Sequence, residues 1–280
     1  MKIEYYSRDG EANSLKFRYF CYPDGQYSVE VEQVCLEELS VRICSRMSGF
    51  DCIQQIACVV SALRSLNADR ITLFVPYLLG ARSDRRFGVA KENYLKDVIA
   101  PVINSLNIDR IETLDVHSNA ALHCVKNLFS IRLTTLAKWV VEQTGPDCTV
   151  VCPDKGGVAR AKWFAAESRT RHPIVFCEKE RDPSTGKILE TVVPVDSFEG
   201  RDVIVVDDIC DGGATFLNLG RKIRERKCGK LYLFVTHGIF SAGFHLLEGA
   251  YDKIFCTDSC KKVDHPLVAQ YPLFGDMDEI

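Results

Sequence analysis

The clearest hydrophobic pattern in the chain is a short apolar run followed, after a polar interval, by an amphipathic stretch. Residues 203–206 are four consecutive β-branched residues, which is typical of a strand buried on both faces of a parallel sheet. Phe216, Leu219 and Ile223 then recur at helical spacing and form one apolar stripe. The interval between them, residues 207–215, contains acids and glycines. We therefore predict a strand, a tight loop and a helix.

The same alternation of apolar runs and amphipathic stretches recurs along most of the chain. It predicts strands at 71–76, 111–115, 149–152, 174–177, 231–236 and 254–257, and helices at 51–66, 91–106, 136–143 and 158–167. Residues 36–47 would lead into the first core strand, and residues 120–129 would form a helix and a turn. Strands that alternate with helices in this way favour an α/β fold built on mainly parallel sheets.

The two ends of the chain differ from this pattern. Residues 16–20 and 27–32 alternate polar and apolar side chains around the Pro-Asp-Gly turn at 22–26, which predicts two strands joined as a hairpin. The last residues, 264–280, end in an acidic sequence that we expect to fray.

The α/β pattern begins again near residues 130–134, which divides the chain into two parts of ordinary domain size. We predict domains at 1–132 and 133–280, with a tail that can return to the first domain.

The composition narrows the class of protein. Hydrophobic residues make up 46% of the 280 residues and charged residues 26%, as in ordinary globular proteins. The net charge of -3 provides no basic surface for nucleic acid or for a membrane. No apolar run approaches the ~20 residues of a membrane span, and the N-terminal sequence lacks the pattern of a signal peptide. We expect a cytoplasmic protein.

The chain contains 13 cysteines, and none of them form a C-x-x-C pair. Several, such as Cys58, Cys152 and Cys177, lie in apolar runs, where cysteine behaves as a small hydrophobic residue. The spacing does not provide four zinc ligands, and a chain of this size in a reducing compartment does not need a disulfide scaffold. We predict reduced thiols.

The interval 207–215 carries the strongest candidate chemistry. Glycines at the start of a helix let several N–H groups converge on an anion, which the helix dipole also favours. Two acids, Asp207 and Asp208, would repel a bare phosphate but would accept hydrogen bonds from the hydroxyls of a phosphorylated sugar. The plain alternative is an ordinary strand-to-helix turn with acids at a helix N-terminus.

This interval resembles a known motif. The sequence V-V-D-D-I-C-D-G-G-A-T at residues 205–215 is similar to the phosphoribosyl-pyrophosphate (PRPP) motif of type I phosphoribosyltransferases, which the ribose-phosphate diphosphokinases share. The resemblance implies that ribose 5-phosphate binds to Asp207, Asp208, Asp211, Gly212, Gly213, Ala214 and Thr215. The motif alone does not distinguish the two groups.

Motifs in the first half resemble the ribose-phosphate diphosphokinases specifically. Y-P-D-G-Q at 22–26 is similar to a segment that contacts the adenine of ATP, and P-Y-L-L-G-A-R-S-D-R-R at 76–86 is similar to one whose arginine reaches the nucleotide phosphates. The resemblance implies ATP-binding roles for Tyr22, Asp24, Gln26, Arg82, Ser83 and Asp84. Gln26 and Ser83 depart from the family, which usually has Glu and Gln at these positions.

Three further motifs complete the resemblance. T-L-D-V-H at 113–117 and C-P-D-K-G-G at 152–157 are similar to the magnesium-binding segments of the family and imply that His117 and Asp154 are metal ligands. From the residues alone, His117 could equally be structural. K-E-R at 179–181 is similar to a loop that closes over the ATP phosphates, which implies catalytic roles for Lys179 and Arg181. T-H-G-I-F-S at 236–241 also resembles the family, and we interpret it as a structural turn.

Taken together, the motifs imply two tandem phosphoribosyltransferase-like domains and a ribose-phosphate diphosphokinase. Such an enzyme transfers the β,γ-diphosphoryl group of ATP to the 1-hydroxyl of ribose 5-phosphate, with Mg²⁺, and yields PRPP and AMP. The resemblance also implies a homo-oligomer. Two alternatives remain open: a phosphoribosyltransferase that consumes PRPP, and a catalytically silent homologue that regulates a true synthetase.

Overall fold

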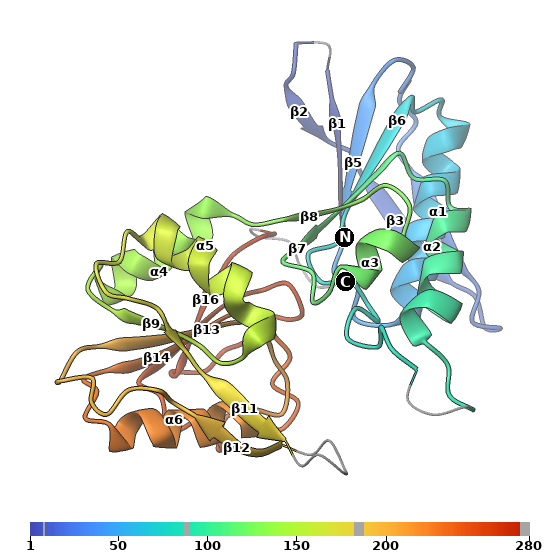
Figure 1. Ribbon diagram of the computed structural model, residues 1–280. Coiled ribbons are helices and arrows are strands. Elements are labelled where there is room, and N and C mark those ends of the chain that lie inside the picture. The colour runs from blue at the N-terminus through green and yellow to red at the C-terminus, as the bar shows by residue number, and fades with distance from the viewer. Residues whose placement is uncertain (8, 87–89, 182–187, 275–280) are drawn as a thin grey trace. The chain divides into compact units, whose positions relative to one another are not determined.

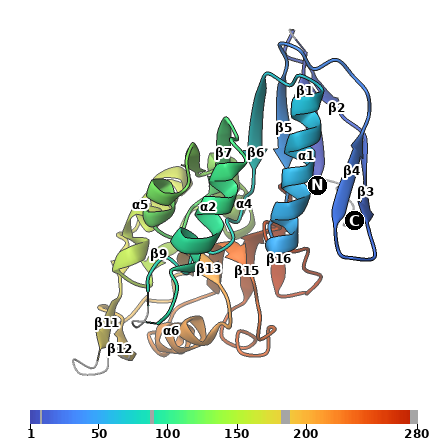
Figure 2. The same ribbon diagram turned by 90° about the vertical axis from the view of Figure 1, so that its right-hand side faces the viewer.

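The protein is described from a computed structural model over residues 1–7, 9–86, 90–181 and 188–274, excluding the side chains of residues 179–181 and 188–190. The chain divides into two compact units, one formed by Met1–Arg132 with Phe274 and the other by Leu133–Leu273. Figures 1 and 2 show the elements of both units. Each unit is described by itself.

The first unit is built on a mixed sheet with the order β2-β1-β5-β6-β7-β8. Its strands are β1 (Lys2–Tyr6), β2 (Ala12–Ser14), β5 (Ser40–Cys44), β6 (Arg70–Phe74), β7 (Arg110–Leu114) and β8 (Leu128–Ile131). Strands β5 to β8 are parallel, whereas β1 runs antiparallel to β2 and β5. A separate hairpin joins β3 (Phe17–Cys21) to β4 (Tyr27–Val31), as the alternating pattern predicted.

The helices of the first unit cover one face of this sheet (Figure 2). They are α1 (Phe50–Ser65), the π-helix η1 (Tyr94–Ile99) that continues into α2 (Ala100–Ser105), and α3 (Ala120–Cys124). Side chains such as Ile43, Ile53 and Ile71 form one core between helices and sheet. The opposite face carries charge: Arg42 and Arg110 both contact Glu112 at 2.7 Å.

The second unit has a fully parallel sheet with the order β10-β9-β13-β14-β15-β16. Its strands are β9 (Thr149–Cys152), β10 (Val175–Phe176), β13 (Val203–Cys210), β14 (Leu231–Gly238), β15 (Lys253–Thr257) and β16 (Val268–Tyr271). An antiparallel hairpin, β11 (Glu178–Arg181) and β12 (Ile188–Val192), follows β10.

Helices cover both faces of this second sheet (Figure 1). Helices α4 (Thr134–Thr144) and α5 (Val158–Ser168) bury Val140 and Phe164 in the core on one face. Helix α6 (Ala214–Glu225) buries Phe216 and Leu219 in the core on the other face. The predicted α/β fold class is therefore confirmed. Because all strands are parallel, their carboxyl ends lie along one edge, where such sheets bind ligands.

The edge strands β2, β8 and β16 and part of the first unit differ from the sequence prediction. The expected pair of strands before residue 32 is four strands, β8 follows the short helix α3, and β16 lies within the tail that we expected to fray. The expected helix at 91–106 is divided into η1 and α2. Edge strands are not buried on both faces, so their sequences lack the continuous apolar run of a central strand. In β16 all four side chains are half-buried, and the sequence shows no alternation of apolar and polar residues.

Two further observations concern composition. Among the residues described, no helix is both long enough and apolar enough to cross a membrane. The 13 cysteines are free thiols, and five of them are buried: Cys148, Cys152, Cys177, Cys210 and Cys256.

Candidate functional site

The acid pair Asp207–Asp208 lies inside β13 and not after it. The strand continues to Cys210, four residues beyond the predicted apolar run. Asp208 is 4% exposed, and its backbone N–H donates to Asp207 Oδ1 at 2.9 Å. Two adjacent carboxyl groups are therefore held at the carboxyl end of a central strand.

Arg160, on α5, provides the positive charge that this pair requires. It is 5% exposed, and its Nη1 lies 3.0 Å from Asp207 Oδ1 while its Nη2 lies 3.7 Å from Asp208 Oδ2. Sequence reasoning missed Arg160. The available signal was its position four residues before buried Phe164, on the stripe of α5 that faces the sheet.

One arginine between two acids leaves an excess negative charge. Burial raises the pKa of Asp207 to about 7; the charge of Asp208 also raises it, while Arg160 lowers it. A carboxyl group that titrates near neutrality at the end of a sheet is a functional-site candidate on physical grounds. It can accept a hydrogen bond from a sugar hydroxyl when ionised.

The glycine loop after β13 leads directly into α6. Gly213 is the residue that precedes the helix and has a left-handed φ of +81°; a Cβ there would also lie 3.3 Å from Leu247. At Gly212 the nearest atom to an added Cβ is Ser241 Oγ at 4.0 Å, so this side is open. Ala214 and Thr215 are exposed in the first turn. The N–H groups of this turn can bind an anion.

Asp154 and its glycines lie beside the acid pair. Asp154 Oδ1 accepts the Gly156 N–H at 2.9 Å, and a Cβ on Gly157 would lie 3.8 Å from Asp207 Oδ1. Cys152 Sγ donates to the Asp154 carbonyl at 3.0 Å, and burial raises the pKa of this thiol to about 11. Cys152 is therefore a neutral donor that holds the loop.

Lys179 and Arg181 lie on β11, in the hairpin that starts after β10. Lys179 is opposite Thr191 in the register, and the pairing shifts between Glu180 and Arg181. The Cys177 N–H donates to the Cys152 carbonyl at 2.9 Å, so the hairpin leaves the sheet beside the Asp154 loop. Lys187, a basic residue that follows the K-E-R motif in sequence and could supply a further cation, lies outside the described residues.

The predicted adenine segment forms the turn of the β3–β4 hairpin. The Tyr22 N–H donates to the Gln26 carbonyl at 2.8 Å, and the Gln26 N–H donates to Asp24 Oδ1 at 3.1 Å. The Tyr22 ring is 51% exposed. Asp24 therefore builds the turn, while Tyr22 offers an aromatic surface on which a base can stack.

The loops after β6 and β7 bring Arg82, Ser83 and Asp84 toward the His117 segment. Ser118 Oγ donates to Asp84 Oδ2 at 2.5 Å, which ties the two loops together. Arg82 and His117 are both exposed. The carboxyl ends of neighbouring strands thus collect these candidates in the first unit.

Asp115, two residues before His117, is in an unusual backbone conformation. It has a left-handed φ of +37°, is 3% exposed and contacts Arg132 Nε at 3.0 Å. Non-glycine residues in this conformation concentrate at functional sites.

The donors that could hold Mg²⁺ are few. Within the described part of the chain, no three His, Cys, Asp or Glu side chains are grouped closely enough to hold a metal ion unaided. Mg²⁺ is commonly bound by one or two carboxylates together with substrate phosphates and water. The Asp154 carboxylate, followed by the exposed residues Lys155 and Gly156, fits this mode, and His117 is an exposed residue.

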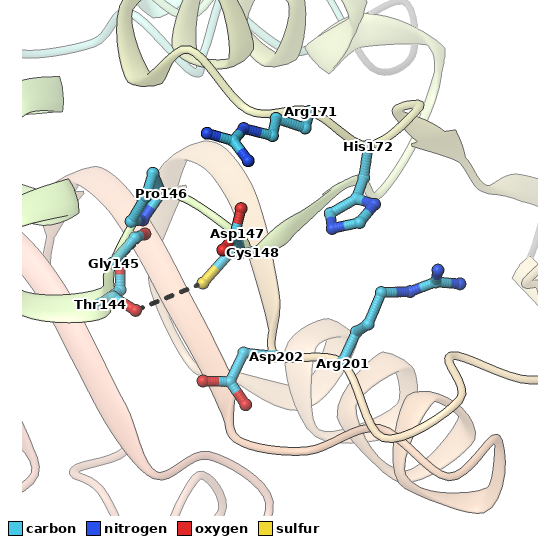
Figure 3. Close-up of a pocket in the computed structure, with 9 residues that line it drawn as sticks. All are labelled: Thr144, Gly145, Pro146, Asp147, Cys148, Arg171, His172, Arg201 and Asp202. Carbon is cyan, nitrogen blue, oxygen red and sulfur yellow. Dashed lines mark hydrogen bonds between the residues drawn. The ribbon is translucent and has the colours of Figure 1, made fainter.

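A hollow of about 560 Å³ lies at the other end of the second sheet, before β9 and β13 (Figure 3). Arg171 and His172 face Arg201 and Asp202 across it. Its charges are mixed, and Asp202 Oδ1 already accepts the Lys230 N–H at 2.7 Å. The hollow contains none of the predicted site residues. The acid pair and the glycine loop lie at the opposite edge of the sheet, where the strands end.

Comparison with known proteins gives a consistent result. A phosphoribosyl transferase domain matches residues 125–253. A ribose-phosphate pyrophosphokinase of Vibrio cholerae is 27% identical over 245 residues, which cover 85% of this chain and 76% of the relative. One of Shewanella oneidensis is 26% identical over 266 residues, covering 89% and 82%.

The fold has a close counterpart among solved structures. The crystal structure of phosphoribosylpyrophosphate synthetase from Mycobacterium smegmatis matches with a TM-score of 0.75 and 20% identity, over 92% of this chain and 86% of that one. This likeness establishes the shared fold. Together with the matched domain and the relatives above, it shows that the chain is similar in sequence and fold to the ribose-phosphate pyrophosphokinases.

Proposed function

We propose that the protein is a ribose-phosphate diphosphokinase that transfers the β,γ-diphosphoryl group of ATP to the 1-hydroxyl of ribose 5-phosphate. The products are PRPP and AMP. The observation that carries the proposal is the end of β13, where an acid pair adjoins an open glycine loop at a helix N-terminus. The names of the relatives support the same activity.

The second unit would bind the sugar phosphate. The phosphate of ribose 5-phosphate would accept hydrogen bonds from the N–H groups of Gly212 to Thr215, at the positive end of the α6 dipole. Asp207 and Asp208 would accept hydrogen bonds from the ring hydroxyls. Arg160 keeps these carboxyl groups in place, so the 1-hydroxyl is oriented before ATP reacts.

The first unit would bind ATP. Tyr22 would stack on the adenine, with Asp24 shaping the turn, while Arg82 would neutralise charge on the nucleotide phosphates. Gln26, Ser83 and Asp84 complete this predicted ATP surface. His117 and Asp154 would each hold Mg²⁺, which when bound neutralises phosphate charge.

Catalysis would consist mainly of positioning and charge neutralisation. The oxygen of the 1-hydroxyl attacks the β-phosphorus, the bond from that phosphorus to the α-phosphate oxygen breaks, and AMP leaves. Negative charge spreads over the transferred oxygens, and Lys179 and Arg181 would stabilise it. The proton of the hydroxyl is lost to solvent or to a nearby carboxylate.

The direct test measures AMP formation from ATP and Mg²⁺, with and without ribose 5-phosphate, and the mass of the sugar product. We expect AMP that depends on the sugar phosphate and a product heavier by one diphosphoryl group. ATP binding without AMP formation would contradict the proposal and favour a silent homologue. Release of pyrophosphate from PRPP in the presence of a nitrogenous base would favour a phosphoribosyltransferase.

Lys179 provides a test within the site. Lys179→Ala removes one charge-stabilising donor, so we expect turnover to fall by about two to three orders of magnitude. Lys162→Ala, at an exposed position on α5, is the matched control and should keep wild-type turnover. Near-normal turnover of Lys179→Ala would show that the hairpin is not the catalytic loop.

Assembly and cellular location are part of the same proposal. The family resemblance favours a cytoplasmic homo-oligomer. Light scattering coupled to size-exclusion chromatography would measure the assembly, and a single species at the mass of one 31.5 kDa chain would contradict it.

A further inference from the structure

The turn after β14 has no role in the reaction proposed above. It belongs to the segment T-H-G-I-F-S at 236–241. Both the Ile239 and the Phe240 N–H groups donate to the Cys210 carbonyl, at 2.9 Å and 3.2 Å. Cys210 is the last residue of β13, so this turn is fastened to the point where the sugar-phosphate loop begins.

The turn holds an unusual backbone conformation. Phe240 has a left-handed φ of +48° although it is a bulky residue, and only 3% of it is exposed. Its ring lies where a Cβ on Gly238 would be, at 2.2 Å, and packs on Phe244 with 4.9 Å between ring centroids. Strained residues persist where the surroundings over-determine them, and they concentrate at functional sites.

The consequence of this conformation is the position of Ser241. Its Oγ donates to Asp211 Oδ1 at 2.5 Å, and it is also the atom that faces the open side of Gly212. Ser241 is exposed and lies outside the apolar core. Its contact is therefore with the loop and not with the structural interior.

We infer that Ser241 is a positioning residue that fixes Asp211 so that the 211–215 loop can receive the phosphate of the sugar. This inference rests on the proposed function. Asp211 is an acidic residue that lies three residues before Ala214, where α6 begins. A carboxylate released there is drawn to the positive end of the helix dipole, where it competes with a phosphate for the same N–H groups. The hydrogen bond from Ser241 restrains one of its oxygens.

The test is the Ser241→Ala variant in steady-state kinetics. Loss of a hydrogen bond to a charged group should raise the KM for ribose 5-phosphate by about 10- to 100-fold. The KM for ATP should stay unchanged, and kcat should change by less than about 3-fold. Ser241→Thr keeps the hydroxyl and should restore the KM to near the wild-type value.

Two controls separate positioning from a structural role. Ser197 is half-buried in the second unit and accepts the Glu199 N–H through its Oγ at 3.0 Å, so Ser197→Ala should leave every constant unchanged. Because Ser241 is exposed, Ser241→Ala should keep the wild-type melting temperature. A lower melting temperature with equal losses for both substrates would mean that Ser241 only supports the fold, and would overturn the inference.

Binding of ribose 5-phosphate, measured by calorimetry with Mg²⁺ and a non-hydrolysable ATP analogue, distinguishes failure of this inference from failure of the proposed function. An active wild-type protein with a Ser241→Ala variant of equal affinity would overturn this inference alone. A wild-type protein that neither binds ribose 5-phosphate nor forms AMP would overturn the proposed function, and the inference with it. A tenfold or greater loss of affinity in Ser241→Ala, restored in Ser241→Thr, supports it.

Discussion

At the scale of single residues, the contact of buried Arg160 with Asp207 and Asp208 predicts a large effect on the stability of the second unit. Removing a charged partner from a buried ion pair leaves uncompensated charge in the protein interior. We expect Arg160→Ala to lower the free energy of unfolding by about 3–5 kcal/mol, measured by urea denaturation. Lys162→Ala on the same helix, at an exposed position, should change it by less than about 0.5 kcal/mol.

The protonation of Asp207 predicts how stability depends on pH. Its pKa is raised from 3.8 to about 7 in the folded protein, so the folded state retains a proton that the unfolded state has released. Its contribution to stability is therefore complete below pH 3.8 and is lost as the pH rises toward 7. Asp207→Asn stays neutral, so it should gain stability relative to the wild type across this range.

Urea denaturation of both proteins at several pH values between 4 and 8 checks this prediction. The difference in unfolding free energy should grow from pH 4 to about pH 7 and then level off. A difference that is constant over the range would mean that the pKa of Asp207 is not raised.

Individual residues also mark the limit of what the sequence could predict. The acids and glycines at 207–215 were recognisable because acids after an apolar run have no core role. Arg160 was not, because a single arginine near an apolar stripe is ordinary on a helix surface. Its role depends on Asp207 and Asp208, which lie more than 40 residues away in sequence and meet it only through the fold.

At the scale of elements, the junction of β14 with its following turn depends on the absence of a side chain at residue 238. A Cβ on Gly238 would lie 2.2 Å and 2.7 Å from two atoms of the Phe240 ring. We expect Gly238→Ala to reduce the unfolding free energy by about 1–3 kcal/mol through overpacking. Gly212→Ala, where the nearest atom is 4.0 Å away, should change it far less.

Urea denaturation of the two glycine variants tests this expectation. The same substitution made in a Phe240→Ala protein tests whether the ring is the cause. In a Phe240→Ala protein the ring is absent, so the added methyl group of Gly238→Ala should cost less than in the wild type. An equal cost in both backgrounds would indicate that the ring is not the obstacle.

The elements with both faces buried were the predictable ones. Strands β9, β13 and β14 each contain a continuous apolar run, and the spacing of Phe216, Leu219 and Ile223 in α6 is an unambiguous helical stripe. Strands β2 and β16 are short and have no fully buried residue. Hydrogen bonds to a neighbouring strand determine the position of β2 and β16 in their sheets. A local sequence pattern does not predict such bonds.

At the scale of the whole molecule, the described residues contain no group of three His, Cys, Asp or Glu side chains that could hold a metal ion. The proposed Mg²⁺ would therefore be bound jointly by the protein and the substrate phosphates. We expect AMP formation to stop when EDTA removes divalent ions and to return when Mg²⁺ is added in excess. Because Mg²⁺ binds mainly through the phosphates, Mg²⁺ alone should hardly change the melting temperature, whereas Mg²⁺ with ATP should raise it. A large rise with Mg²⁺ alone would indicate a site made by the protein itself.

The general architecture could be derived from the chain because the same strand-and-helix alternation appears twice. The two sheets nevertheless differ in a way that the pattern did not indicate. The second is parallel throughout and has helices on both faces, whereas the first has antiparallel strands at one edge and carries the Arg42–Glu112 contact on its other face. Charged residues such as Arg42 and Glu112 satisfy each other there without a covering helix.

The contact of one arginine with two acids also constrains the order in which this site can change over generations. Losing Arg160 first leaves two carboxyl groups in the interior without a positive partner, so such a lineage must pass through a protein that folds poorly. Losing Asp207 first leaves a balanced pair of Arg160 and Asp208, and such a lineage keeps its fold while it gives up the proposed contact to the sugar. A descendant that has abandoned the reaction should therefore retain the arginine longer than the acid.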